Sequence, residues 1–419
     1  LSFTFLSVFL IFAVIGMWFL FSRKTISLKP DMRIFAIFTS IIAIYVSSAF
    51  VRLELFASVG IIILGSIGLT ILTQKIFEQN KQNVTKIIFP AVIIILFIIP
   101  VSMPENNTWL TWAEFPPSIL NGGSSFSQFS SDDWKDAMIW IKENTPEDAV
   151  IASWWDYGYW ITTLSERTTI IDNATLIDWQ IQKMGYVLTT SPENSWNILS
   201  SSYNTDVSSF MDDEFLVPII SNQWRDESGQ TGMSGYIEDK KINPERYSES
   251  CQSIFKAEAQ RLGISEQSCD PIVKGMGADY LLVYIVGERF YTENTNAPLY
   301  TLEGGGDESK KAWFLKISNR QVSKYVQDDN ITPTDYYMKT STLGMLTPFS
   351  IFKYVEPNTG RTFDEYQSGL IPIYVNDLKL KDSEKDPFYL VYASPSFYSQ
   401  DSGVMSAVLI YKINPDYNS

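Results

Sequence analysis

The sequence of 419 residues contains no histidine and only two cysteines. The absence of histidine removes the most common general base and the most common metal ligand of proteins. Ser-His-Asp and Cys-His mechanisms are therefore excluded within this chain, and catalysis would depend on carboxylates, lysines, tyrosines or a metal held by oxygen atoms. Basic residues are also few, since 32 Lys and Arg stand against 47 Asp and Glu, a formal net charge of −15. Nucleic acids are bound through basic stripes, so no nucleic-acid partner is expected.

The two cysteines, Cys251 and Cys269, do not form a CxxC motif, which argues against a zinc site. Both fall in the part of the chain that the hydrophobic pattern places outside the cytoplasm. In an oxidising compartment such a pair is predicted to form one disulfide bond, whose closure of a short loop is worth about 3 kcal/mol. Two free thiols are the alternative.

Long apolar runs are confined to the first quarter of the chain. A transmembrane helix needs roughly 20 mostly apolar residues. The runs that approach this length are Leu1–Phe21, Met32–Phe50, Ala57–Phe77 and Ile87–Met103. The first lacks the basic n-region and the cleavage site of a signal peptide. We therefore expect residues 1–103 to form about four transmembrane helices, and the chain to be a fragment of a longer polytopic membrane protein.

The basic residues between these runs predict the orientation in the membrane. They gather in the first and third connections, at Arg23, Lys24, Lys29, Arg33, Lys75, Lys81 and Lys86. Arg52 is the only basic residue near the second connection. The positive-inside rule then puts the first and third connections in the cytoplasm and everything after Met103 outside it. We expect a multi-pass protein of the cell membrane with an extracellular C-terminal domain, or of the endoplasmic reticulum with a lumenal one in a eukaryote.

The rest of the chain has an ordinary soluble composition and falls into three regions. Residues 104–132 are rich in Pro, Gly, Ser and Asn and are predicted to form a linker or loop. Residues 133–345 alternate predicted strands and helices, which favours a mixed α/β domain, with a polar insertion near 225–270. Residues 346–419 are predicted to be rich in β-structure.

Particular elements of these regions follow from the spacing of apolar residues. A helix is predicted from Asp133, and buried strands are predicted at Ala149–Ser153 and at Ala278–Val286 (ADYLLVYIV). The last two β-rich runs, Pro387–Ala393 and Val404–Ile413, are predicted to pair as a hairpin.

The segment Trp154-Trp-Asp-Tyr-Gly158 directly follows the first of these strands. A Ser or Thr hydroxyl offers one donor and two acceptor lone pairs, an indole N–H only donates, and an ionised carboxylate only accepts. Asp156 as acceptor, with Trp154 and Trp155 as donors, would satisfy one hydroxyl completely and reject an analogue without it. Side chains that are neighbours in a strand point to opposite faces, so a turn is needed, and Gly158 fits such a turn. The alternative is that the tryptophans belong to the core and Asp156 caps the following helix.

The motif Trp154-Trp-Asp-Tyr-Gly158 resembles the WWDYG signature of the catalytic subunit of oligosaccharyltransferase. Arg167-Thr-Thr and Asp172-Asn-Ala-Thr175 resemble the stretch downstream of that signature. Asp307-Glu-Ser-Lys310 resembles the DK motif of the same family, an Asp and a Lys three apart with Met or Ile four residues later, where this chain has Phe314. Val51-Arg52-Leu53 resembles a membrane segment whose Arg contacts the phosphates of the lipid-linked donor.

The resemblance implies asparagine glycosylation by a single-subunit enzyme of archaeal type with a GT-C membrane domain. Oligosaccharide would pass from a dolichyl phosphate or diphosphate to Asn of Asn-X-Ser/Thr, so the implied partners are lipid-linked oligosaccharide, acceptor polypeptides and membrane lipid. The residues implied to bind the acceptor are Trp154, Trp155, Asp156, Tyr157, Gly158, Asp307, Lys310 and Phe314, and Arg52 is implied at the lipid phosphate. The implied Mn²⁺ or Mg²⁺ prefers oxygen ligands, which the family carries upstream of the part of its sequence that this chain matches. No catalytic residue is therefore expected within these residues, and the fragment alone should be inactive.

Simpler interpretations remain for the last two motifs. Asp307 could be an N-cap with Lys310 in solvent, and Arg52 could reach to the membrane interface and pair with Glu54. Two other functions also fit the chain. One is another glycosyltransferase that uses a lipid carrier, such as a protein O-mannosyltransferase, which would need no reader of a +2 hydroxyl. The other is a non-catalytic, membrane-anchored module that binds peptides.

Overall fold

The computed structural model describes residues 2–21, 29–49, 54–78, 83–102, 113–126, 128–175, 177–200, 205–206, 272–273, 276–292 and 297–417. The chain divides into two compact units, Leu1–Phe115 and Pro116–Ser419. Arg52, Cys251 and Cys269 lie outside the described residues, as does most of the polar insertion near 225–270. The predicted phosphate contact and disulfide bond therefore stay predictions.

The first unit contains four helices in the described residues, which agree in position with the four apolar runs. They are α1 Ser2–Phe21, α2 Pro30–Ala49, α3 Glu54–Glu78 and α4 Asn83–Ser102. Two of them have stretches that are long and apolar enough to cross a membrane, Pro30–Ser48 and Phe56–Glu78. The corresponding apolar stretches of the other two, Val8–Phe21 and Asn83–Ile99, are shorter.

Small residues let α3 pack closely against α1 and α2. A Cβ atom on Gly16 would lie 2.0 Å from the carbonyl oxygen of Leu64, and one on Gly68 would lie 2.1 Å from that of Phe12. The Ser40 hydroxyl donates to the carbonyl of Gly60 at 3.2 Å. Close backbone approach at small residues is typical of helices packed in lipid, where burial of apolar side chains gives little drive for association.

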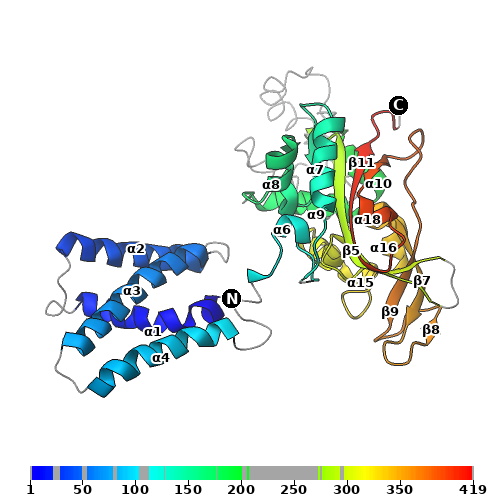
Figure 1. Ribbon diagram of the computed structural model, residues 1–419. Helices are drawn as coiled ribbons and strands as arrows, with labels where there is room; N and C mark the ends of the chain where they lie inside the picture. The colour runs from blue at the N-terminus through cyan, green and yellow to red at the C-terminus, as the bar shows by residue number, and fades with distance from the viewer. Residues whose placement is uncertain are drawn as a thin grey trace, which may run out of the picture. The chain divides into compact units, whose positions relative to one another are not determined.

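The second unit is built on a nine-stranded mixed sheet, in which β5 and β11 run side by side at the centre (Figure 1). The strand order is β10-β11-β5-β6-β9-β7-β8, with β1 paired to β5 and β2 paired to β1. The strands are β1 Val150–Ala152, β2 Thr168–Thr169, β5 Tyr280–Phe290, β6 Leu299–Thr301, β7 Phe349–Val355, β8 Thr362–Phe363, β9 Ile371–Asn376, β10 Phe388–Ala393 and β11 Gly403–Ile413. β3 Thr205–Asp206 and β4 Ile272–Val273 form a separate pair. β1 pairs in parallel with β2 and β5, whereas β5 pairs antiparallel with β11 and β6, and β10 with β11, so the sheet is mixed. Helices accompany this sheet, in agreement with the predicted mixed α/β domain.

The central strand shows why the sequence pattern was informative. β5 is buried on both faces from Tyr280 to Gly287, as expected for a continuous apolar run in the middle of a sheet. It is longer than the predicted strand Ala278–Val286 and ends at Phe290. The predicted pairing of the last two runs is confirmed, because β10 and β11 are antiparallel. A short helix, α18 Pro395–Tyr398, lies between them.

Short helices cover this sheet. They are α6 Ser118–Asn121, α7 Asp133–Asn144, α8 Gly158–Trp160, α9 Asp178–Thr189, α10 Pro192–Leu199, α14 Lys311–Ile317, α15 Val322–Tyr325, α16 Asp335–Thr340 and α17 Thr342–Leu346. Helix α7 begins at Asp133 as predicted and buries Trp134, Met138 and Ile141, an i, i+4, i+7 stripe. Residues Pro116–Asp132, the end of the predicted linker, belong to this second unit.

The edge of β5 opposite β11 is interrupted in its middle. β1 pairs with Tyr280 and Leu281 at the start of that edge, and β6 pairs with Glu288–Phe290 at its end. Buried backbone groups between these two strands need other partners. Asp307 supplies them to Tyr284, because its N–H donates to the Tyr284 carbonyl at 2.7 Å and its Oδ2 accepts from the Tyr284 N–H at 2.9 Å. The interruption therefore holds Asp307 beside the point where β1 ends and the WWDYG segment begins.

Candidate functional site

The WWDYG segment forms a tight turn at the end of β1. Trp155–Tyr157 form a 3₁₀ turn, η2, and the chain continues directly into α8. In a 3₁₀ turn successive side chains point about 120° apart, whereas in a strand they alternate between opposite faces. Gly158 has an ordinary helical conformation, with φ of −56°. Its lack of a side chain is what matters, because a Cβ atom there would lie 2.5 Å from Cα of Asp172.

A chain of polar contacts joins this turn to the DK-like segment. The ammonium group of Lys310 lies 2.8 Å from Oδ2 of Asp156 and donates at 3.2 Å to the hydroxyl of Tyr157. That hydroxyl donates in turn to Oδ1 of Asp307 at 2.7 Å. The structure thus brings together Asp156, Tyr157, Asp307 and Lys310, which lie about 150 positions apart in the sequence.

The simple N-cap interpretation of Asp307 is wrong. The side chain of Asp307 makes no capping hydrogen bond to the 3₁₀ turn η5, Glu308–Lys310, that follows it. It is 1% exposed and is occupied by Tyr157 and by the backbone of Tyr284. Lys310 does not extend into solvent, since it is paired with Asp156. Asp156 likewise lies within η2, and no side chain caps either η2 or α8.

The aromatic residues of the site differ in their accessibility. Trp154 is 1% exposed and packs against Phe314 and Trp313, with ring centroids 4.6 and 4.9 Å apart. The core interpretation is therefore correct for Trp154. Phe314, which is also buried, packs against the Trp154 ring. Trp155 is only partly buried, and its ring lies 6.0 Å from that of Trp154. An acceptor would therefore meet Trp155 and Asp156 more readily than Trp154 or Phe314.

Asp156 offers a free acceptor atom at the surface. Its side chain is 33% exposed, and Lys310 occupies Oδ2. Within the described part of the chain, Oδ1 has no hydrogen-bond partner. One carboxylate oxygen is thus fixed by a cation while the other is available to accept a hydrogen bond from a ligand.

Burial raises the pKa values of Asp307 and Tyr157, the two buried groups of this network. Burial raises the pKa of Asp307 to about 6, although Lys310, the Tyr284 N–H and the Tyr157 hydroxyl all favour its charged form. Burial, reinforced by the negative charge of Asp307, raises the pKa of Tyr157 well above its ordinary value. At neutral pH the network therefore consists of an ionised Asp307 and a neutral Tyr157, which can donate its proton in a hydrogen bond.

The raised pKa predicts how stability depends on pH. In the unfolded chain the Asp307 carboxyl would have its ordinary pKa of 3.8, so the folded state binds this proton more tightly. The free energy of unfolding should therefore fall by roughly 3 kcal/mol as the pH rises from about 4 to about 6, and change little above. Chemical unfolding of the wild-type protein and of Asp307→Asn, followed between pH 4 and 7, isolates this contribution. A difference between the two proteins that does not vary with pH would contradict it.

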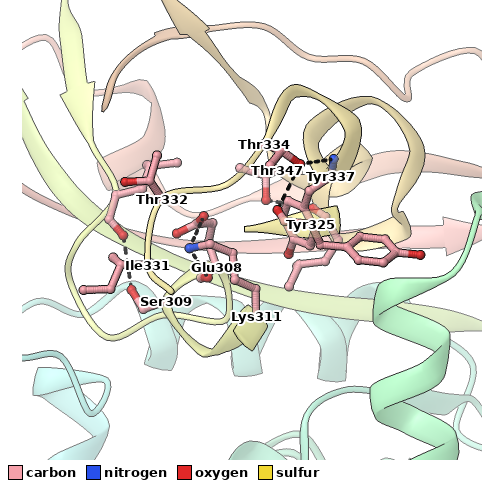
Figure 2. A network of polar contacts seen from close by, with 12 residues as sticks. Glu308, Ser309, Lys311, Tyr325, Ile331, Thr332, Thr334, Tyr337 and Thr347 are labelled. Atoms are coloured by element: carbon pink, nitrogen blue, oxygen red, sulfur yellow. Dashed lines mark hydrogen bonds and ion pairs between the residues drawn. The ribbon is translucent and has the colours of Figure 1, made fainter. Parts of the chain in front are cut away.

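A second polar cluster lies on another side of the same turn. Glu308 and Lys311 form an ion pair at 2.8 Å, and both side chains are at most 5% exposed. Figure 2 shows this pair with Ser309, Ile331 and Thr332 beside it. These residues border a cavity of about 300 Å³. The positions 307 and 310 face the WWDYG turn, whereas 308 and 311 face this cavity, because residues three apart share a face of a 3₁₀ turn.

Two features of the site were missed by sequence reasoning. The link from the Tyr157 hydroxyl to Asp307 was not predicted, and neither was the buried pair Glu308–Lys311. A signal for the first was present, since three glycines before Asp307 allow close approach of backbone: a Cβ atom on Gly306 would lie 2.6 Å from the Tyr284 carbonyl oxygen. No comparable signal marked the second.

No group of three or more acidic or cysteine side chains among the described residues could hold a metal ion. The described residues therefore do not fit the divalent cation that the family resemblance implies.

Comparison with known proteins finds similarity to one family over part of this chain. Residues 146–246, which include the WWDYG turn, match the STT3/PglB/AglB core domain. The chain is 28% identical over 191 residues to subunit STT3 of the dolichyl-diphosphooligosaccharide–protein glycosyltransferase of Dictyostelium discoideum, covering 43% of this chain and 26% of that protein. It is 37% identical over 97 residues to subunit STT3B of the rice enzyme, covering 22% of this chain and 14% of that protein. Related matches extend to yeast STT3, at 28% identity over 179 residues.

These matches agree with the resemblance stated from the motifs: part of the chain is similar to the STT3/PglB/AglB core domain and to STT3 subunits of dolichyl-diphosphooligosaccharide–protein glycosyltransferases. It spans 26% and 29% of the length of the Dictyostelium and Arabidopsis relatives. Among solved structures, an Archaeoglobus fulgidus oligosaccharyltransferase tethered with an acceptor peptide containing the NVT sequon is similar, with a TM-score of 0.37 and 12% identity. That match covers 94% of this chain and 39% of the solved one.

Proposed function

We propose that this chain forms part of the catalytic subunit of an enzyme that glycosylates asparagine in Asn-X-Ser/Thr. The oligosaccharide would come from a dolichyl phosphate or diphosphate carrier, and the WWDYG turn would recognise the +2 hydroxyl. The observation that carries this proposal is the state of Asp156, whose Oδ2 is fixed by Lys310 at 2.8 Å while Oδ1 faces a partly exposed surface.

The geometry of Asp156 suits a hydroxyl better than other ligands. A ligand hydroxyl can donate its proton to Oδ1, which as a carboxylate oxygen only accepts. Lys310 lies 2.8 Å from Oδ2 and offsets part of the charge of Asp156, which weakens the attraction of Oδ1 for a cation. A ligand without the hydroxyl would cover Oδ1 of Asp156 without giving it a hydrogen bond, which costs free energy.

The remaining parts of the proposal concern the surroundings of this site. The first unit would lie in the membrane, which suits its large exposed apolar side chains, such as Trp18 at 74% and Tyr45 at 77% exposure. The second unit would lie outside the cytoplasm. The divalent cation would be held by residues other than those described here, and Arg52 would contact the lipid phosphate. A single subunit would suffice for transfer.

Acceptor peptides that differ only at +2 test the proposal. The complete protein, in membranes that contain lipid-linked oligosaccharide and Mn²⁺, is expected to glycosylate an Asn-X-Thr peptide and to leave its Asn-X-Ala twin unmodified. Equal transfer to both peptides would contradict recognition of the hydroxyl and leave a glycosyltransferase of another kind. No transfer by the folded protein with metal present would favour a peptide-binding module instead.

A further inference from the structure

The turn Asp172–Thr175 packs directly behind the WWDYG segment. It is closed by its own polar groups: the Asp172 N–H donates to the Thr175 hydroxyl at 3.0 Å, and Oδ1 of Asp172 accepts from the Ala174 N–H at 2.8 Å. A third contact runs from the Thr175 N–H to the Asp172 carbonyl at 3.1 Å. Such side-chain-to-backbone bonds fix a turn without help from neighbouring elements.

Asn173 projects from this fixed turn onto the backbone of the WWDYG segment. Its Nδ2 donates to the carbonyl oxygen of Asp156 at 3.2 Å, and its Oδ1 accepts from the N–H of Tyr159 at 3.3 Å. The two backbone groups lie on either side of Tyr157 and Gly158. Gly158 also rests against the same turn, because any Cβ there would lie 2.5 Å from Asp172. The side-chain amide of Asn173 therefore hydrogen-bonds to the backbone on both sides of Tyr157 and Gly158.

The hydrogen bond from Asn173 helps to fix the position of Asp156. Its side chain is held at Oδ2 by Lys310, and its backbone is held at the carbonyl by Asn173. The location of Oδ1, the atom proposed to meet the acceptor hydroxyl, follows from these two anchors. The first comes from the DK-like segment and the second from a loop that carries no residue predicted to touch the acceptor.

Asn173-Ala-Thr175 itself has the form Asn-X-Thr. In the folded chain, however, both ends of the Asn173 amide and the Thr175 hydroxyl are used in internal hydrogen bonds. This triplet thus contributes to the architecture of the site and is not presented as an acceptor.

We propose that Asn173 is a positioning residue for acceptor recognition, which sets the place of Asp156 by holding the Asp156 carbonyl and the Tyr159 N–H from behind. The proposal rests on the proposed function of the WWDYG turn. Asn173 acts through Asp156 and does not touch the acceptor. Its loss should weaken binding of the acceptor more than it slows the transfer of bound acceptor, because the chemical groups of the reaction are unchanged.

Two substitutions at this position separate the contacts. Asn173→Ala removes both hydrogen bonds, whereas Asn173→Asp keeps an acceptor for the Tyr159 N–H but cannot donate to the Asp156 carbonyl. A matched control is Asn414→Ala, because Asn414, which directly follows β11, also holds two backbone carbonyls of the loop before β10, those of Ser383 at 3.0 Å and Asp386 at 2.9 Å.

The experiment measures KM and kcat of the complete protein for an Asn-X-Thr peptide, together with thermal unfolding of each variant. Both Asn173 variants should raise KM about tenfold and change kcat less than about threefold, and Asn414→Ala should lower thermal stability without raising KM. Unchanged KM in Asn173→Ala, or equal KM effects in Asn414→Ala, would overturn the positioning role. A wild-type protein without preference for Thr over Ala would instead contradict the proposed function itself.

Discussion

Replacement of Asp156 by Ala in the complete protein is expected to lower transfer to an Asn-X-Thr peptide roughly 100-fold, the loss associated with one hydrogen bond to a charged group. The substitution removes the only atom of the turn that can accept the hydroxyl proton with a full charge. It also leaves Lys310, which lies 2.8 Å from that carboxylate, without its partner. The ratio kcat/KM for the Thr peptide should fall, while the Ala peptide should stay unmodified, as with the wild-type protein.

The control for this prediction is Asp335→Ala. Asp335 is also paired with a lysine, Lys339, at 2.7 Å, but both side chains are about 70% exposed and lie on α16. Exposed pairs of this kind contribute little, so the variant should keep wild-type kcat/KM. Equal transfer by Asp156→Ala and Asp335→Ala would show that Asp156 does not read the acceptor.

Replacement of Lys311 by Met should reduce the free energy of unfolding by roughly 3–5 kcal/mol, the usual cost of leaving one member of a buried ion pair alone. Glu308 would then be a buried carboxylate without the charge of Lys311, the cation that lies 2.8 Å from it. Burial already raises the pKa of Glu308, and Lys311 opposes that rise. The double substitution Glu308→Gln with Lys311→Met should recover part of the loss, since no unpaired charge remains.

Denaturant unfolding of the two proteins beside Lys339→Met checks this prediction. The control removes a lysine from an exposed pair and should change stability by less than about 1 kcal/mol. A Lys311→Met protein as stable as the control would mean that the pair is solvated in solution. In the structure, Lys310 of this turn pairs with Asp156, and the buried pair Glu308–Lys311 stabilises the opposite side of the turn. That description of the buried pair would then be wrong.

The sequence predicted those parts of the fold whose signal is local. The stripe Trp134, Met138 and Ile141 repeats at helical spacing, and the structure has α7 there. The run ADYLLVYIV is apolar without alternation, and β5 is buried on both faces. Each of these patterns lies within one element, so burial of that element alone determines it.

The interruption in the edge of β5 could not be predicted in the same way. A strand pattern shows which face is buried but does not show which strands pair along each edge. The meeting of Asp307 with Tyr157 depends on β1 stopping after Ala152 and β6 starting only at Leu299. Only the resemblance of both motifs to one family suggested that they lie close together.

Charge patterns were the least informative part of the sequence. Glu308, Lys310 and Lys311 look like an ordinary solvated segment of a short helix. The structure instead buries Glu308 and Lys311 as a pair and directs Lys310 to Asp156. This segment is buried because it lies between β5 and the cavity. Such burial depends on tertiary contacts, so it cannot be predicted from the composition of the segment. The same holds for Asn173, whose sequence context resembles an acceptor although its amide is used within the fold.

The most direct test of the central claim is the equilibrium affinity of the complete protein for two peptides, Asn-X-Thr and Asn-X-Val. Val has nearly the shape of Thr but lacks the hydroxyl, so the comparison isolates the hydrogen bonds of that one group. Because those bonds involve the charged Asp156, the Thr peptide should bind at least about tenfold more tightly, and Asp156→Ala should abolish the difference. Equal affinity of the wild-type protein for both peptides would contradict the account.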